Sequence, residues 1–362
     1  MTKFHSLAIK NIKSETADCI SISFEIPSEL KDSYQYKQGQ YLTLKLPVGG
    51  ETLRRSYSIC TSPFGAEEMR IAVKKVDNGV ASNYLNQVVK VGDHLEVLPA
   101  VGNFYTEMLQ SNNKKYVAFT AGSGITPIMS LLKSVLLVEP NSTFTLIYGN
   151  KNTASVIFKS EIDALVERYP NQLKVQYIYT REGTNGDLFS GRIDKPNCKK
   201  IFDTESGVKN GNEYFLCGPL DMINAVSETL TELGIKKEHI HFELFTSPVS
   251  EESVSSTLKS EVVDDAAAVS ECVAKIVLDG DEKTIKIKKN QTILEAVLDA
   301  GMDAPYACTG GSCCTCRAKV LEGHAVMDVN YALSDSEVKK GYILTCQSHP
   351  TTASITVDYD KS

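Results

Sequence analysis

The sequence predicts a multidomain fold: an antiparallel β-barrel, then an α/β domain with a parallel sheet, then a small α+β domain of the β-grasp type. The chain has 362 residues, more than one ordinary domain contains. Its hydrophobic rhythm changes from short alternating runs to apolar runs separated by helical segments. A segment without aromatic residues then precedes a cysteine-rich end. We therefore divide the chain into residues 1–106, 107–246, 247–271 and 272–362.

Residues 1–106 contain short runs in which apolar and polar side chains alternate, such as 21–26 and 41–46, and Pro and Gly turns separate these runs. A period of two is typical of strands that have one face in a core. Several short strands joined by turns favour an antiparallel barrel.

Residues 107–246 predict the α/β domain, because apolar strands alternate there with helical segments. The strand candidates are residues 115–120, 143–148, 173–179 and 213–216. Such alternation forms βαβ units and hence a parallel sheet.

The segment 247–271 consists largely of Ser, Val, Glu, Asp and Ala without periodicity, and it predicts a flexible linker. Beyond it we expect two strands around residues 279–281 and a helix over 292–300. These elements suffice for a small α+β domain that a bound cluster helps to stabilise.

Composition narrows the classes of function. A net charge of −7 argues against nucleic acid as a partner. Residues 1–19 lack the apolar core of a signal peptide, and no later run approaches the length of a membrane span. We therefore expect a cytoplasmic protein. Four of the ten cysteines are expected to be small buried apolar residues, namely Cys19, Cys60, Cys198 and Cys272.

Four other cysteines give the most specific chemical signal: Cys308, Cys313, Cys316 and Cys346. The spacing C-x4-C-x2-C followed by one distant Cys is typical of plant-type 2Fe–2S ligands. Gly310 and Gly311 accept positive φ and let the loop approach the cluster. A structural zinc site is the alternative, but zinc ligands usually come from two separate pairs. The spacing assigns no iron to Cys314, a fifth thiol in the loop.

A predicted barrel strand carries a candidate flavin motif. Strand alternation places Arg55 and Tyr57 on one face, and Ser56 and Ser58 on the other. A cation beside an aromatic ring suits a flavin with a phosphate tail. Taken alone, these residues fit a surface Arg and a core Tyr better than a flavin site.

A second candidate phosphate site follows at Gly79, Val80, Ala81 and Ser82, which begin a helical segment. Free N–H groups and a hydroxyl at a helix start can bind pyrophosphate. An ordinary N-cap is the alternative.

A glycine-containing turn links the first predicted parallel strand to an apolar helix. We expect Thr126 as the N-cap and Pro127 as the first helical residue, with Gly122 and Gly124 just before them. A dinucleotide pyrophosphate suits this helix start. The turn departs from the dehydrogenase G-x-G-x-x-G, because Pro127 replaces the third glycine and no acidic residue follows the second strand.

The order of these motifs, Arg-x-Tyr-Ser, then Gly-x-x-Ser, then a phosphate-binding turn, resembles the ferredoxin–NADP reductase superfamily. The resemblance implies that Tyr57 stacks on the isoalloxazine ring and that Ser58 hydrogen-bonds near its N5 atom. Arg55 and Ser82 would then bind the pyrophosphate. The form of both motifs favours FAD over FMN.

The same resemblance implies how a nicotinamide nucleotide binds. Thr180 and Arg181 would contact the ribose, and since Arg181 can pair with a 2′-phosphate, NADPH is favoured over NADH. A solvent-exposed Arg is the alternative. The segment Cys217, Gly218 and Pro219 would lie beside the nicotinamide, with Cys217 aligning the hydride donor and the flavin. Phe245 would cover the flavin or the nicotinamide site.

Several stretches near the cysteines further resemble the reductase subfamily that serves phenylacetyl-CoA epoxidases, notably residues 306–308, 316–320, 327–333 and 341–347. This resemblance implies phenylacetate catabolism and electron flow from NADPH through FAD and a 2Fe–2S cluster to a di-iron oxygenase. Alternatives are a Rieske hydroxylase, another di-iron monooxygenase or a desaturase as acceptor. A protein of another class, a redox sensor or scaffold, would transfer electrons only sluggishly.

Overall fold

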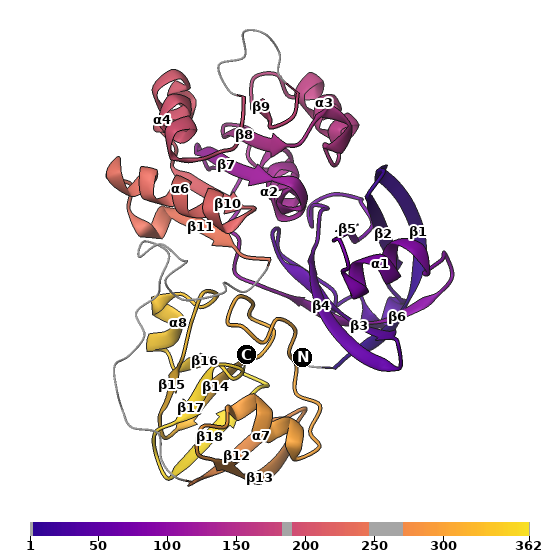
Figure 1. Cartoon of the computed structure of the whole chain (residues 1–362), viewed down its shortest axis with the longest axis vertical. Coiled ribbons are helices and arrows are strands. Elements are labelled where there is room, and N and C mark those ends of the chain that lie inside the picture. Colours follow the sequence, from indigo (N-terminus) through magenta and orange to yellow (C-terminus); the bar gives the residue numbers. More distant parts are fainter. Residues whose placement is uncertain (1–2, 183–189, 246–270, 362) are drawn as a thin grey trace.

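The computed structural model describes residues 3–182, 190–245 and 271–361, which form three domains (Figure 1). The predicted fold class is confirmed: a barrel, a parallel-sheet domain and a C-terminal domain follow one another along the chain. The predicted linker lies outside the described residues except for Glu271, which is the first residue of β12 (Glu271–Leu278).

The barrel is an antiparallel sheet in the order β4-β3-β6-β1-β2-β5. It contains β1 (His5–Thr16), β2 (Cys19–Glu25), β3 (Tyr41–Val48), β4 (Glu51–Ser58), β5 (Arg70–Lys74), β6 (His94–Val101), the 3₁₀ turn η1 (Ser28–Leu30) and the helix α1 (Val80–Gln87). A bridge between Ile59 and Ile71 links the two end strands and closes the barrel. Leu42, Leu44 and Leu46 of β3 are fully buried in its core, as the alternation predicts.

The parallel-sheet domain has the strand order β11-β10-β7-β8-β9. Its elements are β7 (Lys115–Ala121), η2 (Gly122–Gly124), α2 (Ile125–Val138), β8 (Thr143–Asn150), η3 (Thr153–Ser155), α3 (Lys159–Arg168), β9 (Leu173–Tyr179), α4 (Lys195–Thr204), α5 (Ser206–Lys209), β10 (Glu213–Cys217), α6 (Leu220–Glu232), η4 (Lys237–His239) and β11 (Ile240–Glu243). Tyr116 and Ala118 of β7 pack in the core formed with α2 and α3, whereas Val117 and Phe119 pack with α4, α5 and α6. Helices thus cover both faces of the sheet, which explains its continuous apolar strands.

The C-terminal domain has a mixed sheet in the order β13-β12-β18-β14-β16 and a two-stranded sheet, β15-β17. Besides β12 it contains β13 (Asp281–Lys288), α7 (Ile293–Asp299), β14 (Arg317–Glu322), β15 (Ala325–Met327), α8 (Asp335–Lys339), β16 (Tyr342–Leu344), β17 (Ser348–Pro350) and β18 (Ser354–Asp358). The predicted strand pair and helix are confirmed. Thr292 and Glu295 form a capping box that begins α7.

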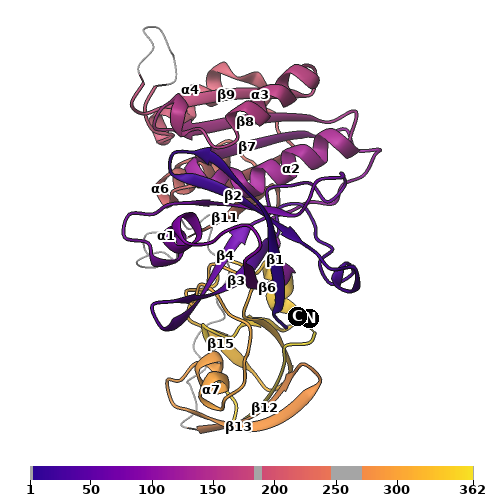
Figure 2. The ribbon, with the colours of Figure 1, turned by 90° about the vertical axis from the view of Figure 1, so that its right-hand side faces the viewer.

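The barrel and the parallel-sheet domain share one core, in which Cys60 and Phe104 pack with the helix α2. An ionic cluster joins the same two domains, because Glu161 of α3 pairs with Lys133 of α2 and, at 3.0 Å, with Arg70 of β5. The C-terminal domain lies below both in Figures 1 and 2, against strands β3 and β4 of the barrel. Among the described residues, no helix has the length and apolarity that a membrane span requires.

Candidate electron-transfer site

The cysteine-rich loop of the C-terminal domain carries three of the four predicted ligands, and the fourth, Cys346, follows β16. Cys313, Cys316 and Cys346 are buried, whereas Cys308 is partly exposed. The Gly310 N–H donates to Cys308 Sγ at 3.4 Å. Positive φ occurs at Gly311, and a Cβ there would lie only 2.9 Å from the Val329 side chain. The expectation of positive φ at Gly310 was wrong, because Thr309 supplies the other left-handed turn residue of this loop.

The four thiols form two pairs. A hydrogen bond with Cys313 lowers the pKa of Cys308 to about 5, and a hydrogen bond with Cys316 lowers the pKa of Cys346. In the described ranges, no three metal-binding side chains converge as one ion requires. Two thiol pairs instead fit two irons with two ligands each, so this donor set suits a 2Fe–2S cluster rather than a single zinc ion.

Cys314 bonds to groups outside the two thiol pairs. Its Sγ donates to the Ala332 carbonyl at 3.4 Å, and its backbone N–H donates to the Tyr41 hydroxyl at 2.8 Å. The fifth thiol therefore lies where the loop meets the barrel.

The candidate flavin residues occupy the end of β4. Arg55 is exposed and donates to the backbone oxygen of Arg54 at 2.7 Å. Tyr57 packs against the barrel core, and burial raises the pKa of its phenol. The Ser56 hydroxyl is 3.2 Å from that of Thr43. The predicted alternation of faces is thus present, while flavin contacts of these residues remain a prediction.

The helix α1 begins at Val80, directly after Gly79, as expected. A Cβ at Gly79 would lie 2.6 Å from the Ser82 hydroxyl, so only glycine fits there. The Ser82 hydroxyl donates to Gly79 O at 3.2 Å and accepts the Val76 N–H at 3.1 Å. The N–H groups of Val80 and Ala81 have no partner within the helix, as in any first helical turn.

The start of α2 differs from the prediction. The helix begins at Ile125 with Gly124 as its N-cap, so Thr126 is the second helical residue rather than the N-cap. The physical reason is the 3₁₀ turn η2, which leads straight into α2 and allows the Thr126 hydroxyl to donate to Ser123 O at 3.1 Å. Gly122 has φ of 55° with open space around its Cα.

Gly124 explains why the end of β10 lies so close to this turn. A Cβ on Gly124 would overlap the carbonyl oxygen of Cys217 and lie 2.5 Å from its carbon. Gly218 is less confined, because a Cβ there would meet the flexible end of Met222 at 2.7 Å and the Ala121 N atom at 3.1 Å. Pro219 is the N-cap of α6. The turn and the Cys-Gly-Pro segment therefore contact each other through backbone atoms.

The remaining nucleotide candidates lie at the ends of β9 and β11. The N–H groups of Thr180 and Arg181 donate to Asn150 O and Lys151 O, at 3.0 and 2.9 Å. Arg181 is exposed, and so is Phe245, which follows β11. Their predicted contacts with nucleotide and flavin remain predictions.

Glu243 is the residue that the sequence analysis missed. It lies opposite Cys217 in the parallel ladder of β10 and β11, and it accepts a hydrogen bond from Ser58 at 3.1 Å. Burial raises the pKa of Glu243 to about 8, and burial together with this carboxyl raises the pKa of Cys217. The sequence offered one indication of its role, because Glu243 lies two residues before Phe245, which was expected at the flavin or nicotinamide site. Ser58 of the barrel thus lies together with Cys217 and Glu243 of the parallel-sheet domain.

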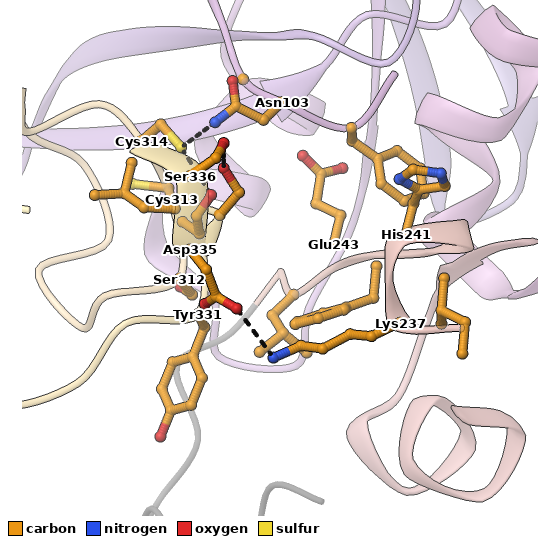
Figure 3. Close-up of a pocket in the computed structure, with 18 of the residues that line it drawn as sticks. Asn103, Lys237, His241, Glu243, Ser312, Cys313, Cys314, Tyr331, Asp335 and Ser336 are labelled. Carbon is orange, nitrogen blue, oxygen red and sulfur yellow. Dashed lines mark hydrogen bonds and ion pairs between the residues drawn. The ribbon is translucent and has the colours of Figure 1, made fainter. Parts of the chain in front are cut away.

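A cavity of about 700 Å³ opens beside Glu243, where all three domains meet (Figure 3). Glu243 and His241 line it from β11, Asn103 lines it from the barrel, and Cys313 and Cys314 line it from the cysteine loop. Glu243 and the cysteine loop therefore border the same space.

Comparison with known families identifies each domain. Residues 6–105 match the oxidoreductase FAD-binding domain, residues 119–228 the oxidoreductase NAD-binding domain, and residues 276–351 the 2Fe-2S iron-sulfur cluster binding domain. The cofactors FAD, nicotinamide nucleotide and a 2Fe–2S cluster follow from these matches.

Full-length relatives share the same domain order. The chain is 37% identical to a component of the 1,2-phenylacetyl-CoA epoxidase of Escherichia coli, over 99% of each chain. It is 33% identical to the ferredoxin reductase component of 3-ketosteroid-9-alpha-monooxygenase from Rhodococcus rhodochrous, over 98% of this chain and 96% of the relative.

Solved structures show the same fold. Phthalate dioxygenase reductase matches with a TM-score of 0.56 and 22% identity, covering 98% of each chain. An intact type IV self-sufficient cytochrome P450 monooxygenase matches with a TM-score of 0.69 and 21% identity, covering 98% of this chain and 41% of that one. The chain therefore belongs to the ferredoxin–NADP reductase superfamily, in the family of NAD(P)H-dependent oxidoreductases that carry a C-terminal 2Fe–2S domain and include reductase components of oxygenases.

Proposed function

We propose that this chain supplies electrons from NADPH, through FAD and its 2Fe–2S cluster, to a di-iron oxygenase that epoxidises phenylacetyl-CoA in the cytoplasm. The relative named as a component of 1,2-phenylacetyl-CoA epoxidase matches along its whole length, which supports this acceptor. All ten cysteines are free thiols, which supports a reducing compartment.

The observation that carries the proposal is the position of Tyr41. Its Cα pairs with that of Ser58 across the β3–β4 ladder, and its hydroxyl accepts the N–H of Cys314 in the cluster loop. One buried side chain thus connects the candidate flavin site with the cluster ligands. Such proximity suits a protein that moves electrons between two cofactors held by different domains.

When bound, the cofactors would supply the redox chemistry, namely hydride transfer from nucleotide to flavin and single-electron acceptance at the cluster. The side chains position them. Gly122 of η2 leaves open space in which a pyrophosphate would approach the start of α2, and Arg181 with Thr180 would bind a 2′-phosphate. Below pH 8 the Glu243 carboxyl holds its proton beside Ser58, so the hydride site carries little negative charge.

Anaerobic stopped-flow absorbance with NADPH or NADH tests the donor. We expect flavin absorbance to fall first and cluster absorbance afterwards, faster with NADPH. The variant Arg181→Ala should lower kcat/KM for NADPH by about tenfold to a hundredfold, because a charge-assisted hydrogen bond contributes about 1.5–3 kcal/mol. NADH should be unaffected, and Arg168→Ala, at the exposed end of α3, is the matched control.

Reconstitution tests the acceptor. The reductase is mixed with a purified di-iron oxygenase, NADPH and phenylacetyl-CoA, and epoxide formation is measured. Turnover with a Rieske hydroxylase and none with the di-iron enzyme would assign the chain to the alternative acceptor.

A further inference from the structure

The outer face of the barrel strands β3 and β4 is polar, yet the C-terminal domain covers it. Strand alternation sends the leucines of β3 inward and places Tyr41, Thr43 and Lys45 outward. All three outward side chains contact the C-terminal domain: Tyr41 and Thr43 reach Thr315 at 3.3 and 3.2 Å, and Lys45 reaches Asp303 at 3.5 Å. This face is therefore a docking face rather than a solvated one.

Arg54 of β4 makes the densest contact on this face. Only 5% of its side chain is exposed. Its Nη1 donates to the Ala304 carbonyl at 2.8 Å, and its Nη2 pairs with the Asp303 carboxylate. The guanidinium also lies over the Tyr306 ring, 4.2 Å from the centroid. A buried guanidinium requires such partners, and all three belong to the segment that leads into the cluster loop at Cys308.

A second contact holds the other side of the loop. Asn103, which follows β6, donates to both carboxylate oxygens of Glu337 at 2.9 and 3.0 Å. Glu337 in turn accepts from Arg317, which directly follows the ligand Cys316. The loop is thus fixed on the barrel at both ends, with Tyr41 between them.

Arg54 and Arg55 are neighbours on opposite faces of one strand. The expected chemistry of the flavin motif needs only Arg55, so nothing in that motif accounts for Arg54. Arg55 contacts the backbone oxygen of Arg54, not its side chain, so the two guanidinium groups are independent.

We propose that Arg54 is a positioning residue for electron transfer from flavin to cluster, because it docks the C-terminal domain on the barrel through Asp303, Ala304 and Tyr306. The inference rests on the proposed electron flow. In each transfer the reduced flavin would lose one electron and the oxidised cluster would gain it. The cluster holds only one transferred electron, so the flavin would lose its second electron after the oxygenase has taken the first from the cluster. Arg54 touches neither cofactor, and its effect is on the distance and orientation between them.

The test separates docking from hydride transfer. In anaerobic stopped flow with NADPH, Arg54→Gln should leave the rate of flavin reduction within about twofold and slow cluster reduction by about tenfold or more. The reason is that Gln cannot replace the contacts of the buried guanidinium with Ala304, Asp303 and the Tyr306 ring. Asp303→Asn should also slow cluster reduction. In the variant that carries both substitutions, the fold-decrease in this rate should be smaller than the product of the two single fold-decreases, because the two residues contact each other. Arg54→Lys should recover part of the rate. Lys275→Gln, which breaks an ion pair with Glu282 within the C-terminal domain, is the control and should change neither step.

A second readout needs no electron flow. Hydrogen exchange of the oxidised holoenzyme should show faster exchange over residues 303–315 in Arg54→Gln, with unchanged FAD and iron content. Unchanged exchange and an unchanged rate of cluster reduction would overturn the proposal, as would an equal loss in flavin reduction. A wild-type cluster that NADPH never reduces would instead refute the proposed function, and exchange would still decide the role of Arg54.

Discussion

Replacing Gly124 with alanine tests whether the backbone contact between the α2 turn and Cys217 sets the geometry for hydride transfer. The added Cβ would overlap the Cys217 carbonyl oxygen and lie 2.5 Å from its carbon and 3.0 Å from Gly218 N. The obstructing atoms are backbone, so no side chain can rotate away.

The displacement sets the magnitude. Carbon atoms pack at about 3.5 Å or more, so β10 and the turn must separate by about 1 Å. A misplacement of about 1 Å in a reacting geometry costs about a hundredfold in rate. Overpacking of this kind should also lower the free energy of unfolding by about 1–3 kcal/mol.

The assay is the anaerobic rate of flavin reduction by NADPH at saturation, together with FAD content and thermal unfolding. The matched control is Gly234→Ala, at the end of α6, where φ is 79° and a Cβ meets open space. It should lose comparable stability, about 1–2 kcal/mol, with no loss of hydride transfer. A Gly124→Ala variant that reduces its flavin at the wild-type rate would refute the reasoning.

Three further outcomes are expected. Cys314→Ala should retain the visible absorbance and iron content of the cluster, whereas Cys316→Ser should lose most of both; loss of iron in the Cys314 variant would show that this thiol is a ligand. The pKa of Glu243 is raised from 4.5 to about 8 in the folded protein. The stabilising contribution of the protonated carboxyl is therefore complete below pH 4.5 and is lost as the pH rises to about 8. The melting temperature of Glu243→Gln should consequently decline less over this pH range than that of the wild type. Glu161→Gln removes the carboxylate that Lys133 and the partly buried Arg70 share, while Lys133 keeps Glu67 and Arg70 keeps Glu15. It should lower the free energy of unfolding in urea by about 1.5–3 kcal/mol, the contribution of hydrogen bonds to a charged group. A loss below about 0.5 kcal/mol would mean that the remaining carboxylates and solvent compensate the two cations.

The fold was predictable because its signals are local. Alternation along β3, the apolar strands of the parallel sheet and the turn chemistry around Gly280 each depend on residues only a few positions apart. Local signals also explain the wrong prediction of Thr126 as an N-cap. Its sequence context is typical of an N-cap, but the preceding 3₁₀ turn makes Gly124 the N-cap instead.

The cofactor-binding modules could be read from the amino-acid order, because the spacing of Cys308, Cys313 and Cys316 and the succession of phosphate-binding turns are properties of short segments. How the modules contact one another depends on the packing of the domains. Ser58 and Glu243 are 185 residues apart in sequence, and Arg54 and Asp303 are 249 apart. Such pairs leave no periodic or local pattern in the sequence. The packing of the domains decides which polar side chains are buried against each other, and buried polar groups must then form hydrogen bonds with one another.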